Sequence, residues 1–444
     1  MKSIVRRLKG SKHMRPSTKI YTITEYGGFV RGKEPLLGYQ PLPDKAFDAL
    51  ETFILANSSR SETETLDLLS LSARRGIGKI ITARNYVGLI TMHDGTVIEI
   101  LPKVHNSNIG LADTRRIFLE MLKTLKDVVF KDFNISDLNT DRLSLFEIFI
   151  TMFVNEVTLL KKQGLKSSYT PVEANERFFK GKLIVAQDIK NNLVCREHFF
   201  VRYDEFSIDR PENRLIKSTL RYLLMHTHDE RNRLALSRLL AFFDGVAFSA
   251  DYAADLTRCV TDRNMSHYEK ILLWCKIFLR GNSFTAFAGS EVAIALLFPM
   301  EKVFESFIAA KLRRHITDGF EIRTQDARYS LFDHPTRAFA LRPDIVLSRG
   351  KQTVVMDTKW KLLADNVRNY GISQSDMYQM YAYGKKYDAA NIVLLYPLPG
   401  SLLDREISFK SDDGVTVNVA FIDLLQPDAS VSRLLSDVSG TRAV

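Results

Sequence analysis

Two acids and a lysine near the end of the chain have the types and spacing needed for phosphodiester hydrolysis. Asp344 begins an apolar run over residues 345–347, and a second apolar run over residues 353–356 leads into Asp357 and Lys359. Side chains alternate between the two faces of a strand, so Asp357 and Lys359 are predicted to point the same way. If the two runs pair as a hairpin, Asp344 lies beside Asp357. Two carboxylates could then hold a hard cation through oxygen with an amine next to them, as metal-assisted hydrolysis requires.

The spacing of these residues matches the PD-(D/E)xK pattern of nucleases. Pro343-Asp344 supplies the first part, and Asp357-Thr358-Lys359 supplies the second. The letters alone are weak evidence, because acids and lysines are common, and a surface hairpin with solvated charges would show the same pattern. The context favours a nuclease, since both acids adjoin β-prone apolar runs that suit a buried sheet.

A helix predicted before the hairpin carries another acid towards it. Residues 300–314 have apolar side chains at helical spacing, and Glu305 lies against that apolar face. Glu305 could be an additional ligand for a metal ion or a water molecule. On spacing alone, an acid at the solvent edge of an amphipathic helix fits equally well, and Glu301, one turn earlier, is the fallback.

A helix predicted after the hairpin, over residues 373–383, is expected to end at Gly384. Asp376, Gln379 and Tyr383 lie on one side of this helix. Gln379 could order a water molecule or a phosphate, although such a glutamine is more often a structural hydrogen-bonding group. A strand over residues 391–397 follows, so helix, strand, strand, helix and strand are expected to form an α/β core.

Longer blocks of sequence carry more information than the three charged residues. They are residues 85–90, 98–103, 209–217, 298–307, 342–345, 357–361 and 375–383. In these blocks the chain resembles the McrC family, the nuclease subunit of modification-dependent restriction systems, with Val303 where leucine is more usual. The resemblance implies cleavage of modified foreign DNA, above all DNA that contains methylcytosine.

The resemblance and the residues together define the predicted site. Its catalytic residues are Asp344, Asp357, Lys359, Glu305 and Gln379. Asp344, Asp357 and Glu305 are the expected metal ligands, for Mg²⁺ with Mn²⁺ as a substitute. Lys359 would position or deprotonate the attacking water, or stabilise negative charge on the phosphate.

The chain is expected to depend on a partner for energy. Gly32-Lys33 and Gly78-Lys79 have the glycine and lysine of a phosphate-binding loop, but Glu34 and Ile80 stand where serine or threonine is required. We therefore predict that the chain itself binds no nucleotide. The resemblance implies two partners, double-stranded DNA and an AAA+ GTPase ring of the McrB type whose hydrolysis the chain stimulates. Pairing of two nuclease domains across two complexes is an option for cutting both strands.

The expected fold class is a multi-domain α/β protein, because 444 residues exceed one compact core. An N-terminal β-rich domain, a helical middle region and a C-terminal PD-(D/E)xK nuclease core with a mixed sheet flanked by helices are predicted. The expected divisions are a basic, flexible N-terminal segment (1–20), a β-rich partner-docking domain (21–110), a mainly helical region (111–283), the nuclease domain (284–425) and a C-terminal tail (426–444).

Composition excludes a membrane span and indicates a cytoplasmic protein. The chain has no run of about eighteen uncharged apolar residues, as a transmembrane helix would need. Its cysteines (Cys195, Cys259 and Cys275) are scattered and odd in number, which fits a reducing compartment better than a disulfide framework.

Most of the formal net charge of +10 lies in residues 1–20, which hold seven basic residues and no acid. This segment could bind phosphate without sequence preference, although a disordered start ahead of the first domain, with Met14 as an alternative initiator, fits slightly better. Three alternatives stay open: a stand-alone nuclease of repair or restriction, a non-catalytic assembly protein, and a DNA-binding regulator. Cleavage without GTP or a partner would favour the first alternative.

Overall fold

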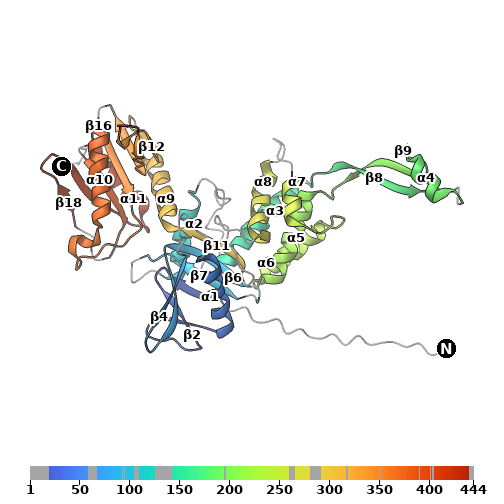
Figure 1. Ribbon diagram of the computed structural model, residues 1–444, viewed down its shortest axis with the longest axis horizontal. Coiled ribbons are helices and arrows are strands. Elements are labelled where there is room, and N and C mark those ends of the chain that lie inside the picture. The colour runs from blue at the N-terminus through green and yellow to red at the C-terminus, as the bar shows by residue number, and fades with distance from the viewer. Residues whose placement is uncertain are drawn as a thin grey trace.

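The computed structural model describes most of the chain, in the ranges 20–58, 68–92, 94, 96–104, 110–125, 143–194, 197–259, 266–280, 292–316, 319–350, 352–389, 391–400, 402 and 405–439. Within these ranges the chain is a mixed α/β protein with eleven α-helices and five β-sheets. Figure 1 shows a C-terminal lobe, a central β-rich part with helices beside it, and an arm that projects from these helices. Apart from Ile20, the predicted basic segment lies outside the described residues.

Two four-stranded sheets and one helix form the β-rich part. The first sheet has the order β1-β7-β6-β11, and the second has the order β3-β2-β5-β4. Helix α1 contacts strands of both sheets, and one apolar core joins all three elements. The elements are β1 (Ile20–Thr24), β2 (Gly28–Arg31), β3 (Gln40–Leu42), α1 (Asp44–Ser58), β4 (Leu69–Arg74), β5 (Gly78–Ala83), β6 (Tyr86–Met92), β7 (Val97–Leu101) and β11 (Val292–Pro299).

The first sheet is covered on both faces, which explains why its strands are almost continuously apolar. Ile90 and Ile98 face the core shared with α1, whereas Leu89 and Val97 face the helices of the middle region. Those helices are α2 (Leu111–Leu122), α3 (Leu145–Gln163), α5 (Pro211–His226), α6 (Glu230–Phe242), α7 (Tyr252–Arg258) and α8 (Ser266–Arg280).

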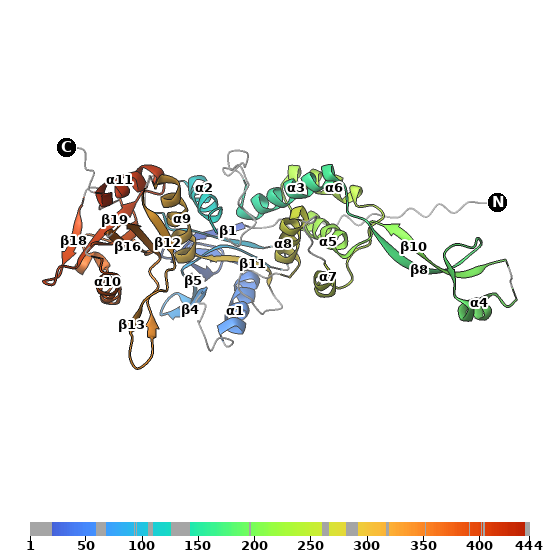
Figure 2. The same ribbon diagram turned by 90° about the horizontal axis from the view of Figure 1, so that it is seen from above.

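The arm is a long two-stranded ribbon with a short helix near its end. Strands β8 (Ser168–Glu176) and β10 (Phe199–Ser207) pair antiparallel along their whole length. Strand β9 (Lys182–Leu183) and helix α4 (Val185–Asn192) complete the arm. In both views the arm extends away from the C-terminal lobe (Figures 1 and 2). The arm therefore has little packing beyond its own residues.

A six-stranded mixed sheet with the order β12-β15-β16-β17-β19-β18 forms the centre of the C-terminal lobe. Strand β16 pairs antiparallel with β15 and parallel with β17, which pairs parallel with β19. The elements are α9 (Met300–His315), β12 (Glu321–Thr324), β13 (Ser330–Phe332), β14 (Ala338–Ala340), β15 (Ile345–Arg349), β16 (Gln352–Thr358), α10 (Gln374–Tyr387), β17 (Asn391–Pro397), β18 (Ile407–Lys410), β19 (Thr416–Ile422) and α11 (Pro427–Ser439).

Helices on both faces of this sheet determine where each side chain of β16 points. Val354 and Met356 belong to the core that includes α9, whereas Val355 belongs to the core that includes α10. Side chains alternate along a strand, so Asp357 and Lys359 follow Val355 towards α10. Trp360 faces the other way and packs on Phe304 of α9, with ring centroids 5.3 Å apart.

The predicted order of helix, strand, strand, helix and strand is present, but β12, β13 and β14 lie between the first helix and the hairpin. The prediction that Gly384 ends the second helix is wrong, since α10 continues to Tyr387 and Asp388 caps it in the left-handed conformation. A Cβ on Gly384 would lie 2.8 Å from a methyl of Val415 and 2.9 Å from one of Ile392. This glycine lets the helix pack closely on the sheet.

Two segments lie differently from the expected divisions. Strand β11, placed in the nuclease domain by the sequence, pairs with β6 in the first sheet and runs directly into α9. Residues 426–444, expected to be a tail, include α11, which packs against α9 and β19. Among the described residues no helix combines the length and apolarity needed to cross a membrane.

Candidate active site

The hairpin of β15 and β16 brings Asp344 beside Asp357, as predicted. The register pairs Ile345 with Met356, so the two acids are the next residues along their strands. The carboxylate of Asp344 is fixed by Thr358, whose backbone N–H and hydroxyl donate to Asp344 Oδ2 at 2.8 and 2.7 Å. Asp344 Oδ2 is thus turned towards the end of β16, next to the second acid.

The carboxylate of Asp357 is almost completely buried, with 3% of the residue exposed. Burial and the nearby charge of Asp344 raise its pKa to about 7, against the opposing effect of Lys359. The Lys359 ammonium lies 2.8 Å from Asp357 Oδ2, but no described group donates a hydrogen bond of good geometry to this oxygen. The ion pair and the missing hydrogen bond are compatible, because an ion pair needs only a short distance, whereas a hydrogen bond also needs an aligned donor. A buried carboxylate oxygen with spare accepting capacity is available for a cation.

The ammonium of Lys359 lies among groups from β16 and α10. It donates to Gln379 Oε1 at 3.3 Å and lies 3.6 Å from Asp376 Oδ1. Burial lowers the pKa of Lys359, but the acids, led by Asp357, outweigh burial and raise the pKa overall. Gln379 donates in turn to the hydroxyl of Tyr383 at 2.8 Å. The three polar residues predicted on one side of this helix therefore do lie on the side that faces the hairpin.

Glu305 lies near this centre, but a residue that the sequence did not single out separates it from the acids. Gln325 Nε2 donates to Glu305 Oε1 at 2.6 Å and to Asp344 Oδ1 at 3.2 Å. The described residues contain no group of three or more His, Cys, Asp and Glu side chains arranged to hold a metal ion. The structure thus brings together Asp344, Asp357, Lys359 and Gln379, while Glu305 is linked to Asp344 through Gln325.

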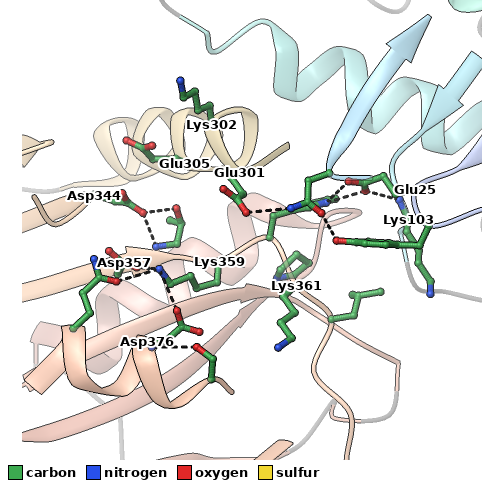
Figure 3. Close-up of a pocket in the computed structure, with 18 of the residues that line it drawn as sticks. Glu25, Lys103, Glu301, Lys302, Glu305, Asp344, Asp357, Lys359, Lys361 and Asp376 are labelled. Atoms are coloured by element: carbon green, nitrogen blue, oxygen red, sulfur yellow. Dashed lines mark hydrogen bonds and ion pairs between the residues drawn. The ribbon is translucent and has the colours of Figure 1, made fainter. Parts of the chain in front are cut away.

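These groups line one end of a cleft of about 800 Å³ whose other end belongs to the β-rich part. Figure 3 shows Asp344, Asp357 and Lys359 at one end, with Glu25 and Lys103 at the other. Trp360 Nε1 donates to both carboxylate oxygens of Glu25, at 3.1 and 2.9 Å. No periodicity or motif in the sequence indicated that the β-rich part reaches this cleft.

The fold and the site define a mixed α/β protein with an acid pair and a lysine at the end of adjacent sheet strands. A family model described as the McrBC 5-methylcytosine restriction system component matches residues 81–397. The chain belongs to this family. A comparison with curated proteins found no match.

Two solved structures have the same fold. One is a half-complex from a tetradecameric assembly of Thermococcus gammatolerans McrB AAA+ hexamers with bound McrC, with 22% identity and a TM-score of 0.69. That match covers 95% of this chain and 100% of the other. The second is the cryo-EM structure of the Thermococcus gammatolerans McrBC complex, with 23% identity, a TM-score of 0.51, and coverage of 68% of this chain and 89% of the other.

Proposed function

We propose that this chain is the nuclease subunit of an McrBC-like restriction complex, and that its C-terminal lobe is a PD-(D/E)xK endonuclease domain. Its reaction is hydrolysis of phosphodiester bonds in DNA that contains 5-methylcytosine. The observation that carries the proposal is the buried Asp357 carboxylate, which has one oxygen without a hydrogen bond and lies beside Asp344 and Lys359. Burying an acid in this way is costly for folding, and sites that accept such a cost are often catalytic.

The acid pair fits a divalent cation such as Mg²⁺, because hard cations prefer oxygen ligands and often take few of them from the protein. Asp344 and Asp357 would hold the ion. Glu305 could join them if Gln325 released it, since the same amide now bonds Glu305 and Asp344. When bound, the ion supplies Lewis-acid chemistry by withdrawing charge from the scissile phosphate and favouring ionisation of water.

The chain's own groups would orient the substrate and stabilise charge. Lys359 is fixed between Asp357 and Gln379, so its ammonium is positioned to stabilise the negative charge that develops on the phosphate. Gln379 accepts from Lys359 and donates to Tyr383, which restricts how the lysine can move. Thr358 restricts Asp344 in the same way. Such restraint favours catalysis, because reacting groups lose less freedom when substrate binds.

An AAA+ GTPase ring is the proposed partner, since a structurally similar McrC is bound to McrB AAA+ hexamers. The expectation that residues 21–110 dock on this ring and stimulate its GTP hydrolysis stays a prediction.

The arm offers a second surface. Nine large apolar residues of the arm are exposed: Tyr169, Phe178, Phe179, Val185, Ile189, Leu193, Val194, Phe199 and Phe206. A soluble protein seldom exposes so many large apolar residues unless another protein covers them, so we propose the arm as a further docking surface for the ring.

Substitution of Asp357 by alanine tests the proposed function. The full chain, its GTPase partner, GTP, Mg²⁺ and a plasmid that carries 5-methylcytosine are combined, and cleavage is followed on a gel. The Asp357→Ala chain should leave the plasmid intact while GTP hydrolysis by the partner continues. Asp333→Ala is the matched control, because Asp333 pairs with Lys386 on the surface and lies outside the cleft. Cleavage by Asp357→Ala at the wild-type rate would refute the assignment.

A further inference from the structure

A carboxylate from the start of the chain contacts the residue that follows the proposed catalytic lysine. Glu25 lies just after β1 and is 1% exposed, and 335 positions separate it from Trp360. Its Oε2 accepts from Trp360 Nε1 at 2.9 Å and from the backbone N–H of Lys103 at 3.1 Å. Oε1 accepts from the same indole at 3.1 Å. Burial of an acid is costly for folding, so this contact requires a reason.

The contact is located where the sheet no longer restrains the chain. Strand β16 ends at Thr358, which pairs with Leu395, and Lys359 makes one last backbone hydrogen bond to Leu395 O at 2.8 Å. Trp360 is the next residue, and its ring lies against Phe304 on one side while its N–H points at Glu25. The chain that leaves the sheet after Lys359 is therefore held by the anchored indole of Trp360.

Other bonds keep the β-rich part in register with the C-terminal lobe at this place. The backbone N–H of Met300, the first residue of α9, donates to Asn85 O at 3.0 Å. The side chain of Asn85 donates to Glu301 Oε1 at 3.4 Å. Figure 3 shows Glu301 between the end of the cleft that holds Glu25 and the end that holds the acid pair. The position of Glu25 relative to the catalytic end is thus fixed by more than its own contact.

We infer that Glu25 is a positioning residue for Lys359, acting through the indole of Trp360, and that it couples the β-rich part to the cutting centre. The inference rests on the proposed function. The β-rich part then completes the active site, because without Glu25 the indole loses its only described hydrogen-bond acceptor and the residues after β16 lose an anchor. Displacement of a catalytic group by about 1 Å can slow a reaction by about a hundredfold, so a contact made by Trp360, the residue next to Lys359, can matter.

Three variants test the inference in the full chain, assembled with its GTPase partner, Mg²⁺ and 5-methylcytosine plasmid. Glu25→Ala should lower the cleavage rate at saturating DNA by about tenfold or more and change the DNA concentration at half-maximal rate by less than about twofold. Glu25→Gln should retain most of the rate, because its one carbonyl oxygen can accept both bonds that Oε2 now accepts. Trp360→Phe should lose as much as Glu25→Ala, since it keeps the ring and lacks the donor.

The double variant Glu25→Ala/Trp360→Phe should lose no more than either single variant, as expected for two residues that act through one contact. Glu99→Gln is the matched control. Glu99 is also fully buried in the first sheet, where it accepts from Thr22, Arg115 and the N–H of Leu145. Its substitution should leave the cleavage rate within about twofold of wild type, because none of these bonds reaches the cleft.

Fluorescence gives a readout that does not depend on cleavage. The chain has two tryptophans, so a Trp274→Phe background reports Trp360 alone. In that background Glu25→Ala should shift the emission of Trp360, and Glu99→Gln should leave it unchanged. Wild-type cleavage by Glu25→Ala, an equal loss in Glu99→Gln, or an unshifted emission would each overturn the inference. A different result would be a wild-type chain that does not cut DNA together with a shifted emission in Glu25→Ala. That result would refute the proposed function and with it the positioning role, but it would support the contact between Glu25 and Trp360.

Discussion

The cleft and the arm treat their side chains in opposite ways. In the cleft, two acids are buried beside polar partners: Glu25, 1% exposed, lies against Trp360, and Asp357, 3% exposed, lies against Lys359. On the arm, apolar groups are exposed, and Val194 at 90% exposure is the extreme case. Both arrangements are costly for an isolated chain, since buried charges lose hydration and exposed apolar groups order water.

This difference separates two kinds of function. Under the proposed function, the buried charges of the cleft serve chemistry on a substrate, whereas the exposed apolar groups of the arm serve contact with another protein. The cleft contains hydrogen bonds that restrain its groups, made by Thr358, Gln379 and Trp360. On the arm, bonds such as Arg202 to Glu173 and Tyr203 to Glu176 join residues of the arm itself. We therefore expect substitutions in the cleft to affect cutting and substitutions on the arm to affect assembly.

A large effect on cutting is expected at the lysine. Lys359→Gln removes the charge that lies 2.8 Å from Asp357 Oδ2 and should slow plasmid cleavage by about a hundredfold or more. Lys361→Gln is the control from the same cleft, because the Lys361 ammonium donates to the carbonyl of Gly371 and not to Asp344 or Asp357. It should stay within about threefold of wild type. Equal losses in both variants would mean that general charge, and not the position of Lys359, supports cutting.

A pH-dependent stability difference is expected at Glu25. Burial raises the pKa of this carboxyl from 4.5 to about 7. Hydrogen bonds from Trp360 and Lys103 lower the pKa and so oppose burial, whereas the charge of Glu301 raises it further. As pH rises between these values the unfolded carboxyl ionises first, so the wild-type protein loses stability. Glu25→Gln lacks this loss. The free energy of unfolding of Glu25→Gln, relative to that of the wild type, should therefore rise by roughly 3 kcal/mol as pH rises through this range. Urea unfolding at about pH 5 and about pH 8 measures the gain, and a constant difference would contradict it.

Assembly should respond to the arm and not to the cleft. Ile189→Ser with Leu193→Ser replaces two exposed apolar side chains and should weaken binding of the GTPase ring by about tenfold. Sedimentation of the mixed complex and stimulated GTP hydrolysis measure the effect. Leu234→Ser is the control, because Leu234 on α6 is similarly exposed at 53%. Unchanged binding by the arm variant would leave residues 21–110 as the proposed docking surface.

The smallest effect is expected at Glu305. Glu305→Gln removes a charge but keeps an oxygen that can accept from Gln325, so cleavage should fall by about fivefold at limiting Mg²⁺. Excess Mg²⁺ should restore the rate if Glu305 assists the metal. Glu301→Gln, one turn earlier on the same helix and in the same cleft, should have no comparable effect. A larger loss for Glu301 would identify the fallback acid as the functional one.

Much of the candidate active site could be predicted from the sequence, because it depends on local geometry. A short connection fixes the hairpin register, which brings Asp344 to Asp357, and strand alternation directs Lys359 towards α10. The helix period then brings Gln379 to the same place. Each of these steps needs only residues that are close in the sequence or that belong to one regular element.

The remaining parts of the cleft depend on packing between distant segments, which no local pattern encodes. Gln325 reaches Glu305 and Asp344 from a turn in the left-handed conformation after β12. Glu25 meets Trp360 because β11 joins the first sheet and continues directly into α9. The prediction that a helix ends at Gly384 was wrong for a related reason. A glycine can end a helix or let it pack closely, and only the neighbouring strands decide between the two.

Substitution of Asp344 by asparagine tests the central claim most directly. Asparagine keeps an oxygen for the two bonds from Thr358, so the fold should persist while the charge is lost. Plasmid cleavage and GTP hydrolysis are measured in the same reaction of the assembled complex. The prediction is a loss of cleavage of about a thousandfold or more, with GTP hydrolysis within about twofold of wild type. Cleavage within about tenfold of wild type would contradict a cutting centre built on Asp344 and Asp357.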